Sequence, residues 1–123
     1  SLPGSYRFPL RGDGTQSREF TFVEDVVEAT IRAGLHLDES QLEPLDIGGG
    51  VSASLNEVIN MVQEITDSKT RIDNYPLPPG DPKVTTASTA KVKNLLGWEA
   101  TTSLADGLRK QHLSLTQKLV PTL

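Results

Sequence analysis

Apolar residues recur at every second position, or gather in a short run, in four segments of the chain. Each segment is predicted to form a strand, and the four lie at residues 6–11, 20–22, 44–47 and 70–75. In the first of them, Tyr6, Phe8 and Leu10 share one face. The segment Pro44–Ile47 runs directly into three consecutive glycines. The pattern therefore predicts several short strands.

A helical period predicts two helices in the first half of the chain. The first begins near Val23 and is expected to end near Gly34, because glycine suits the left-handed residue after a helix. Its apolar stripe is predicted to pack in the core and consists of Val23, Val26, Val27, Thr30 and Ile31. The second helix begins at Ser54, which has capping-box spacing to Glu57. Its stripe consists of Leu55, Val58, Ile59, Val62 and Ile65.

Two further helices close the chain. Ser88 is predicted to cap the first of them, which stops at Gly97, and Trp98 directly after it is expected to fill the core. Ser103 and Asp106 are predicted to cap the last helix, whose inner face carries Leu104, Leu108 and Leu115. The expected fold class is α/β, an α+β lobe of about four helices with short strands, forming one domain over residues 1–123.

The composition limits the cellular compartments and the binding partners to be expected. The chain of 123 residues has a net charge of −4 and no cysteine. The acidic balance argues against nucleic acid or an anionic membrane as a partner. The lack of cysteine excludes disulfides and thiolate metal sites, and no apolar run approaches the ~18 residues of a transmembrane helix. We expect a cytoplasmic protein.

Residues 11–29, RGDGTQSREFTFVEDVVEA, combine a glycine-rich turn, a short strand and the start of a helix. Gly12 and Gly14 flank Asp13, a pattern suited to a turn that needs positive φ. Arg18 is the one cation between the turn and the strand. It stands where a loop could aim its guanidinium at an anion.

This stretch resembles the segment GDGTQTRDFTYVDDVVEA of the extended short-chain dehydrogenase/reductase family, the nucleotide-sugar epimerases and dehydratases. Three later segments of the chain, LDIGGGVSASLNEV, ASTAKVKNLLGW and TSLADGL, resemble YNIGGGEPVSLNEL, ADISKAKRLLGW and TSLEEGL of the family, in family order. The resemblance covers nearly the whole chain but only the last third or so of a family member. It implies the C-terminal substrate-binding part of an epimerase fold, without the Rossmann dinucleotide domain.

The resemblance implies a nucleotide-sugar site. Arg18 matches the arginine that contacts the diphosphate, and Asp81 matches an aspartate that contacts the ribose. Arg11 stands where the family often has a tyrosine against the base. Its guanidinium either stacks on a base through cation–π attraction or is a solvated surface charge. Pro78 stands where the family usually has a second diphosphate arginine, and proline cannot replace that contact.

The resemblance also implies which chemistry is missing. Family members carry a glycine-rich cradle for NAD or NADP and a catalytic tyrosine four residues before a lysine. At that spacing, Tyr6 is followed by Leu10 and Tyr75 by Pro79. We therefore expect no catalytic residue and no bound cofactor in this chain, which leaves its activity as an enzyme open.

Two other features have simpler explanations than a site. His36, expected in a polar loop, and His112 on the last helix each lack a partner at metal-ligand spacing, so no metal site is expected. The glycine triplet at residues 48–50 matches neither the dinucleotide fingerprint nor the P-loop. The resemblance implies that these glycines only turn the chain.

Three hypotheses for the function follow. The chain is the nucleotide-sugar-binding lobe of an epimerase-like oxidoreductase, a non-enzymatic ligand-binding or protein-interaction module, or an inert truncated relic. As partners we expect a weakly bound nucleoside-diphosphate sugar, and either a homodimer or a missing dinucleotide-binding domain that covers the edge of the Pro44–Ile47 strand. Alternatively, Arg18 only pairs at the surface with Glu19 or Asp13, a contact worth about 0–1 kcal/mol.

Overall fold

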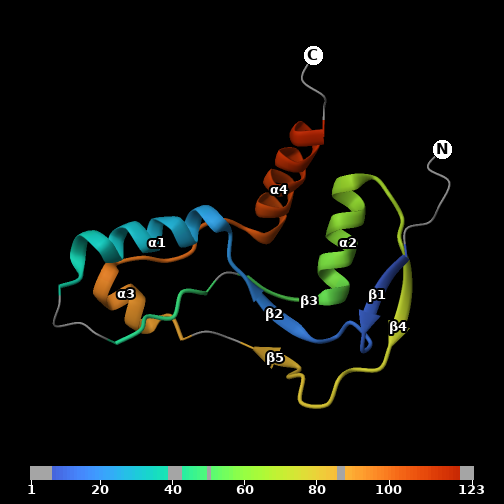
Figure 1. Cartoon of the computed structure of the whole chain (residues 1–123), viewed down its shortest axis with the longest axis horizontal. Helices are drawn as coiled ribbons and strands as arrows, with labels where there is room; N and C mark the ends of the chain where they lie inside the picture. Colours follow the sequence, from blue (N-terminus) through green and yellow to red (C-terminus); the bar gives the residue numbers. More distant parts are fainter. Residues whose placement is uncertain (1–6, 39–42, 50, 86–87, 120–123) are drawn as a thin grey trace. The chain divides into compact units, whose positions relative to one another are not determined.

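The computed structural model describes residues 7–38, 43–49, 51–85 and 88–119 (Figure 1). The expected mixture of four helices with short strands is confirmed in these ranges. In chain order the elements are β1 (Arg7–Arg11), β2 (Ser17–Phe20), α1 (Val23–His36), β3 (Val51–Ser54), α2 (Leu55–Thr66), β4 (Arg71–Tyr75), β5 (Val84–Thr85), α3 (Ala90–Leu96) and α4 (Leu104–Leu119).

The chain divides into two compact units. The first unit comprises Ser1–Arg18, Ala53–Val84 and Leu108–Leu123, and the second comprises Glu19–Ser52 and Thr85–Gly107. The single domain expected over residues 1–123 stays a prediction, because this division describes packing and not independent folding.

A parallel pair of strands organises the first unit. β1 and β4 pair in register from Arg7 opposite Arg71 to Arg11 opposite Tyr75, and they lie side by side in Figure 1. Both strands were predicted from their apolar pattern. Leu10 of β1 is buried, whereas Phe8 is 44% exposed; Tyr6 lies outside the described residues.

The first turn of α2 confirms the predicted capping box. The Glu57 N–H donates to Ser54 Oγ at 3.2 Å, and the Ser54 N–H donates to Glu57 Oε2 at 2.7 Å. These reciprocal bonds satisfy two backbone donors that a helix N-terminus otherwise leaves open. The local sequence alone therefore fixes where α2 begins.

Two strand predictions were wrong in position. Pro44–Ile47 is not a strand, and Leu45 and Ile47 instead pack against the buried cluster of the second unit. An apolar run predicts burial, but a strand also needs a hydrogen-bonding neighbour, which the run does not supply.

The strand predicted at residues 20–22 lies earlier in the chain, because β2 ends at Phe20 and Phe22 is the N-cap of α1. β3 was not predicted; it belongs to a three-stranded sheet in the order β3-β2-β5.

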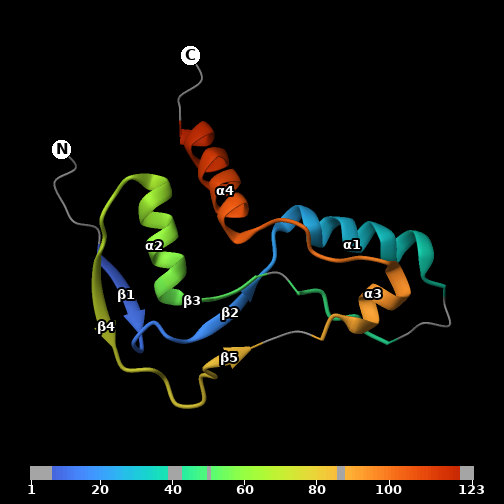
Figure 2. The ribbon, with the colours of Figure 1, turned by 180° about the vertical axis from the view of Figure 1, so that it is seen from behind.

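The core of the second unit lies where α1 meets α3, the two helices that lie side by side in Figure 2. Its buried members are Ala29, Val92, Leu96 and Trp98. Trp98, at 1% exposed, fills the core as predicted. Its indole Nε1–H donates to the Asp25 carbonyl oxygen at 2.9 Å, so the polar edge of the ring is satisfied.

The predicted core stripe of α1 was wrong. Four of its five members are exposed: Thr30, Val23 at 63%, Val27 at 50% and Ile31 at 56%. Leu35 at 75% extends this face by one turn. The buried residues of α1 are Asp25 and Ala29 instead. The small side chain of Ala29 lets the ring of Trp98, which follows α3, pack closely against the helix. This contact with Trp98, and not the apolar period of α1, therefore determines which face of α1 is buried.

Two helix boundaries differ from the sequence prediction. α1 runs past Gly34 to His36, which is therefore its last residue and not part of a loop. Gly34 is not among the glycines with positive φ, so it does not adopt the left-handed conformation that would end the helix there. The N-cap of α3 is Thr89, which makes no side-chain cap bond, and not Ser88. Gly97 ends α3 as predicted, with φ +61.

The cap of α4 is confirmed in part. The Asp106 N–H donates to Ser103 Oγ at 3.2 Å. Leu104 is buried, but Leu115 is 52% exposed, so the predicted inner face does not extend along the whole helix. No helix in the described ranges combines the length and the apolar character needed to cross a membrane.

Asp25 is a buried carboxylate that holds the loop before α4. Its Oδ2 accepts hydrogen bonds from the N–H groups of Thr101 (3.3 Å) and Thr102 (3.0 Å), and its Oδ1 accepts one from Thr101 Oγ1 at 3.1 Å. Burial by itself would raise the pKa of Asp25, but these bonds from Thr102 and Thr101 outweigh burial and lower it.

Substituting Asp25→Asn should lower the free energy of unfolding by about 2–4 kcal/mol, because the partly buried donors of Thr101 and Thr102 lose a charged acceptor. Urea denaturation measures this, with Glu64→Gln on the exposed face of α2 as a control expected to stay within about 0.5 kcal/mol. The stabilisation should be complete above the ordinary aspartate pKa of about 3.9 and be lost as the pH falls through the lower pKa of folded Asp25. Equal stability of Asp25→Asn and the control would contradict this role.

Candidate functional site

The glycine-rich turn after β1 is fixed by the neighbouring strand. The Gly12 N–H donates to the Tyr75 carbonyl oxygen at 2.8 Å, and Asn74 Nδ2 donates back to the Gly12 carbonyl oxygen at 3.0 Å. Gly12 has φ +87, a conformation that glycine adopts without strain. The end of β4 therefore determines where the chain leaves β1.

The other side of the same turn is held by the start of α2. The N–H groups of Leu55 and Asn56 donate to the carbonyl oxygens of Gln16 (3.1 Å) and Gly14 (3.0 Å). Asn56 Nδ2 also donates to the Asp13 carbonyl oxygen at 3.1 Å. The first N–H groups of a helix have no partner within it, so this turn supplies the missing acceptors.

The carboxylate of Asp13 is used inside the turn. Its Oδ1 accepts hydrogen bonds from the hydroxyl and the N–H of Thr15. The Thr15 hydroxyl contributes most to lowering the pKa of Asp13 below its ordinary value, followed by the Thr15 N–H. Asp13 thus stiffens the turn.

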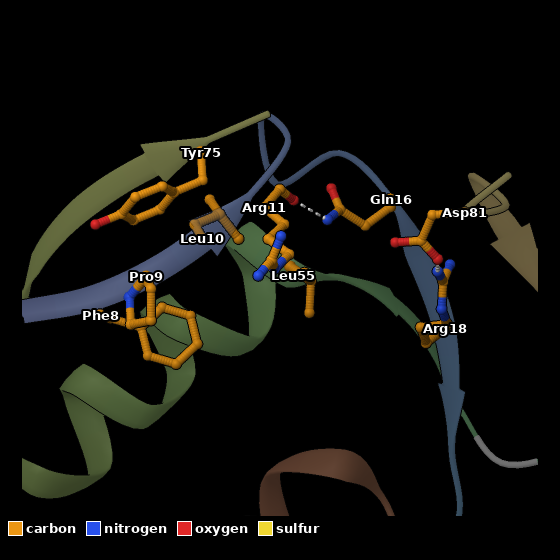
Figure 3. Close-up of a pocket in the computed structure, with 9 residues that line it drawn as sticks. All are labelled: Phe8, Pro9, Leu10, Arg11, Gln16, Arg18, Leu55, Tyr75 and Asp81. Carbon is orange, nitrogen blue, oxygen red and sulfur yellow. Dashed lines mark hydrogen bonds and ion pairs between the residues drawn. The ribbon is translucent and has the colours of Figure 1, made fainter. Parts of the chain in front are cut away.

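A pocket of about 390 Å³ lies in the first unit, beside this turn (Figure 3). This volume falls within the usual range for small-molecule sites, about 300–1,000 Å³. The residues that line it come from β1, the turn, β2, the start of α2, β4 and the loop before β5: Phe8, Pro9, Leu10, Arg11, Gln16, Arg18, Leu55, Tyr75 and Asp81.

Arg18 is held at one side of the pocket by three acceptors. Its Nη1 donates to the carbonyl oxygens of Ser17 (2.8 Å) and Lys83 (3.4 Å), and its Nη2 lies 3.3 Å from Asp81 Oδ1. The structure thus gives Arg18 a different ion-pair partner from the expected Glu19 or Asp13. Asp81 follows the proline-rich loop, 63 residues away in the sequence.

The structure brings the three predicted site residues, Arg11, Arg18 and Asp81, to one pocket. Figure 3 shows Arg18 and Asp81 pointing at each other, with Arg11 at the end of β1. Their roles toward a ligand stay predictions. Pro78, which occupies the place of the family's second arginine, is not among the lining residues.

Sequence reasoning missed Gln16 and Tyr75. Gln16 is 6% exposed, and its Nε2 donates to the Arg11 carbonyl oxygen at 2.6 Å, so it joins the two ends of the turn. Tyr75 lies opposite Arg11 in the β1–β4 register. Nothing in the sequence around Gln16 predicts that its side chain is buried and bonded to Arg11. Tyr75 becomes a candidate site residue only once the pairing of β1 with β4 is known.

Gly49, in the middle of the glycine triplet, is already occupied by contacts within the chain. The Gly49 N–H donates to Glu19 Oε2 at 3.3 Å, and the side chain of Thr89 fills the space beside Gly49. At Gly49, a phosphate would find neither a free N–H nor enough space. Among the described residues, no group of histidine and carboxylate side chains could hold a metal ion.

A family model described as GDP-mannose 4,6 dehydratase matches residues 4–111, most of the chain. The chain belongs to the NAD-dependent nucleotide-sugar epimerase/dehydratase family, among the extended short-chain dehydrogenases/reductases. The predicted resemblance is thus confirmed. The described fold is a partial epimerase fold.

Known family members are much longer than this chain. UDP-glucuronate 4-epimerase of Thermodesulfobacterium geofontis (strain OPF15) is 34% identical over 100 residues, which are 80% of this chain and 30% of that protein. GDP-mannose 3,5-epimerase 1 of Oryza sativa subsp. indica is 32% identical over 114 residues, 92% of this chain and 29% of that protein. The crystal structure of UDP-glucuronic acid 4-epimerase from Bacillus cereus in complex with UDP-glucuronic acid and NAD has a TM-score of 0.81 at 33% identity, covering 89% of this chain and 35% of that one. The chain spans about a third of their length.

The turn that supports the pocket offers a matched pair of glycine substitutions. Gly14 and Gly80 both have positive φ, but a Cβ at Gly14 meets the Asn56 side chain whereas a Cβ at Gly80 has nothing within 4 Å. Gly80→Ala should therefore cost only backbone strain, about 1–2 kcal/mol. Gly14→Ala should cost about 2–4 kcal/mol, because Asn56 must also leave its bond to Asp13. Urea denaturation of the two variants checks the difference, and equal losses would show that Asn56 moves without cost.

Proposed function

We propose that this chain is the nucleoside-diphosphate-sugar-binding part of an NAD-dependent epimerase or dehydratase and is not catalytic by itself. The observation that carries the proposal is the pocket of the first unit, where Arg11, Arg18 and Asp81 meet although the chain as a whole is acidic. Guanidinium groups suit phosphates, and a carboxylate accepts hydrogen bonds from sugar hydroxyls. The Bacillus cereus relative, in complex with UDP-glucuronic acid and NAD, supports the same class of ligand.

In this proposal each polar side chain has one role. Arg18 contacts the diphosphate, and Asp81 accepts a hydrogen bond from a ribose hydroxyl. The ion pair between them, 3.3 Å long with side chains 27% and 37% exposed, must open or be shared when the ligand enters. A partly exposed pair of this kind is worth about 0–1 kcal/mol, so its opening is a small part of the binding free energy.

The proposal assigns no hydride or proton transfer to this chain. The family chemistry uses NAD or NADP together with a tyrosine and lysine four residues apart, and neither Tyr6 nor Tyr75 has a lysine at that spacing. The chain alone is therefore expected neither to bind NAD tightly nor to turn over a nucleotide sugar. The cytoplasmic location expected from the composition also stays a prediction.

Replacing Arg18 by alanine should weaken binding of UDP-glucuronic acid by about tenfold or more, because a charge-assisted hydrogen bond contributes about 1.5–3 kcal/mol. Chemical-shift titration of the whole chain measures this. Arg71→Ala on β4, outside the pocket lining, is the matched loss of one positive charge and should leave the affinity nearly unchanged. Unchanged binding in Arg18→Ala would remove Arg18 from the site, and micromolar binding of NAD would contradict the assignment to substrate alone.

The exposed face of α1 supports a second part of the proposal, a covering partner. Val23, Val27, Ile31 and Leu35 stand one helical turn apart and are all at least half exposed. We define these four residues as the α1 stripe. Contiguous apolar surface of this kind is typical of interfaces. Since the relatives are about three times longer than the matched region, the proposed occupant is the rest of an epimerase fold, the dinucleotide-binding domain.

Without that domain, the isolated chain should self-associate through the α1 stripe at micromolar concentration. Ile31→Lys should shift sedimentation toward the monomer, because a lysine in the centre of the stripe opposes burial. Leu113→Lys, a similarly exposed leucine on α4, is the control and should leave the association unchanged. A wild type that sediments as a monomer and binds no hydrophobic dye would contradict a covered α1 stripe.

A further inference from the structure

The two arginines that line the pocket differ in how far their charge is already compensated. Arg18 donates to two carbonyl oxygens and to the carboxylate of Asp81. The guanidinium of Arg11, in contrast, has no hydrogen bond or ion pair with any residue in the ranges that the structure describes. Asp81 is the only acidic residue in the lining, so the positive charge left over in the pocket resides on Arg11.

The backbone of Arg11 is fixed even though its side chain is free. Gln16 Nε2 donates to its carbonyl oxygen at 2.6 Å, and the following Gly12 N–H is bonded to Tyr75 at 2.8 Å. Its Cα is paired with that of Tyr75 at the end of the β1–β4 ladder. A fixed Cα keeps the guanidinium within one side-chain length of this pocket, which Arg11 lines (Figure 3).

We infer that Arg11 binds the diphosphate of the ligand and is the first cation to meet it, rather than stacking on the base. This inference rests on the proposed nucleotide-sugar site. An incoming anion gains a full guanidinium charge at Arg11, whereas at Arg18 it must compete with Asp81 for the same donors. Once the diphosphate is held at Arg11, Arg18 exchanges Asp81 for a phosphate oxygen, and Asp81 becomes available to a ligand hydroxyl.

The test compares three probes on the full chain at low ionic strength, where charge contributions are least screened. The probes are inorganic pyrophosphate, uridine diphosphate and uridine, and the measurement is calorimetric or chemical-shift titration. The variants are Arg11→Gln, Arg18→Gln and the control Arg71→Gln, which removes the same charge from β4 outside the pocket lining. Arg11→Gln should weaken binding of pyrophosphate and uridine diphosphate about tenfold or more and leave uridine binding unchanged.

The outcomes separate this inference from the proposed function. If the wild type binds uridine diphosphate and Arg11→Gln behaves like Arg71→Gln, the inference is wrong and the site stands. If Arg11→Gln loses uridine instead of pyrophosphate, Arg11 contacts the base and the inference is again wrong. If pyrophosphate binds through Arg11 but uridine diphosphate does not bind, Arg11 is a diphosphate-binding residue as inferred, and the proposed nucleotide-sugar ligand is wrong. A wild type that binds none of the probes overturns both.

Discussion

The parallel pairing of β1 with β4 is the constraint on which the pocket depends. It places Arg11 opposite Tyr75, although the two residues are far apart in the sequence. The Tyr75 carbonyl then accepts from Gly12 and so fixes the turn that leads to Arg18. A strand pair with a shifted register would move every side chain of β1 relative to β4, and the lining of the pocket would no longer assemble.

The first turn of α2 completes this arrangement from the opposite side. A helix begins with N–H groups that it cannot satisfy itself. Here the carbonyl oxygens of Gln16 and Gly14 accept from two of them, while Ser54 and Glu57 satisfy each other through the capping box. The turn beside the pocket is therefore held by hydrogen bonds from α2 and β4, and none of them uses the guanidinium of Arg11 or the carboxylate of Asp81, which pairs with Arg18 instead.

The second unit is built on a polar anchor inside an apolar core. Asp25 occupies the inner face of α1 together with Ala29, and it holds both Thr101 and Thr102. Because these buried positions are occupied by a carboxylate and a small residue, the larger apolar side chains of α1 lie on the outer face. The orientation of α1 that buries Asp25 and lets Trp98 donate its hydrogen bond thus also leaves the α1 stripe exposed.

The sequence by itself determined the features that depend on neighbours in the chain. These include the capping box at Ser54 and the left-handed stop at Gly97; the sequence also identified the family to which the motif around Arg18 belongs. Only the tertiary structure decided which face of α1 is buried, that Pro44–Ile47 does not form a strand, and that Arg18 meets Asp81. Each of these features depends on contacts between segments that are distant in the sequence. A local pattern of apolar or charged residues does not indicate which distant segment will make the contact.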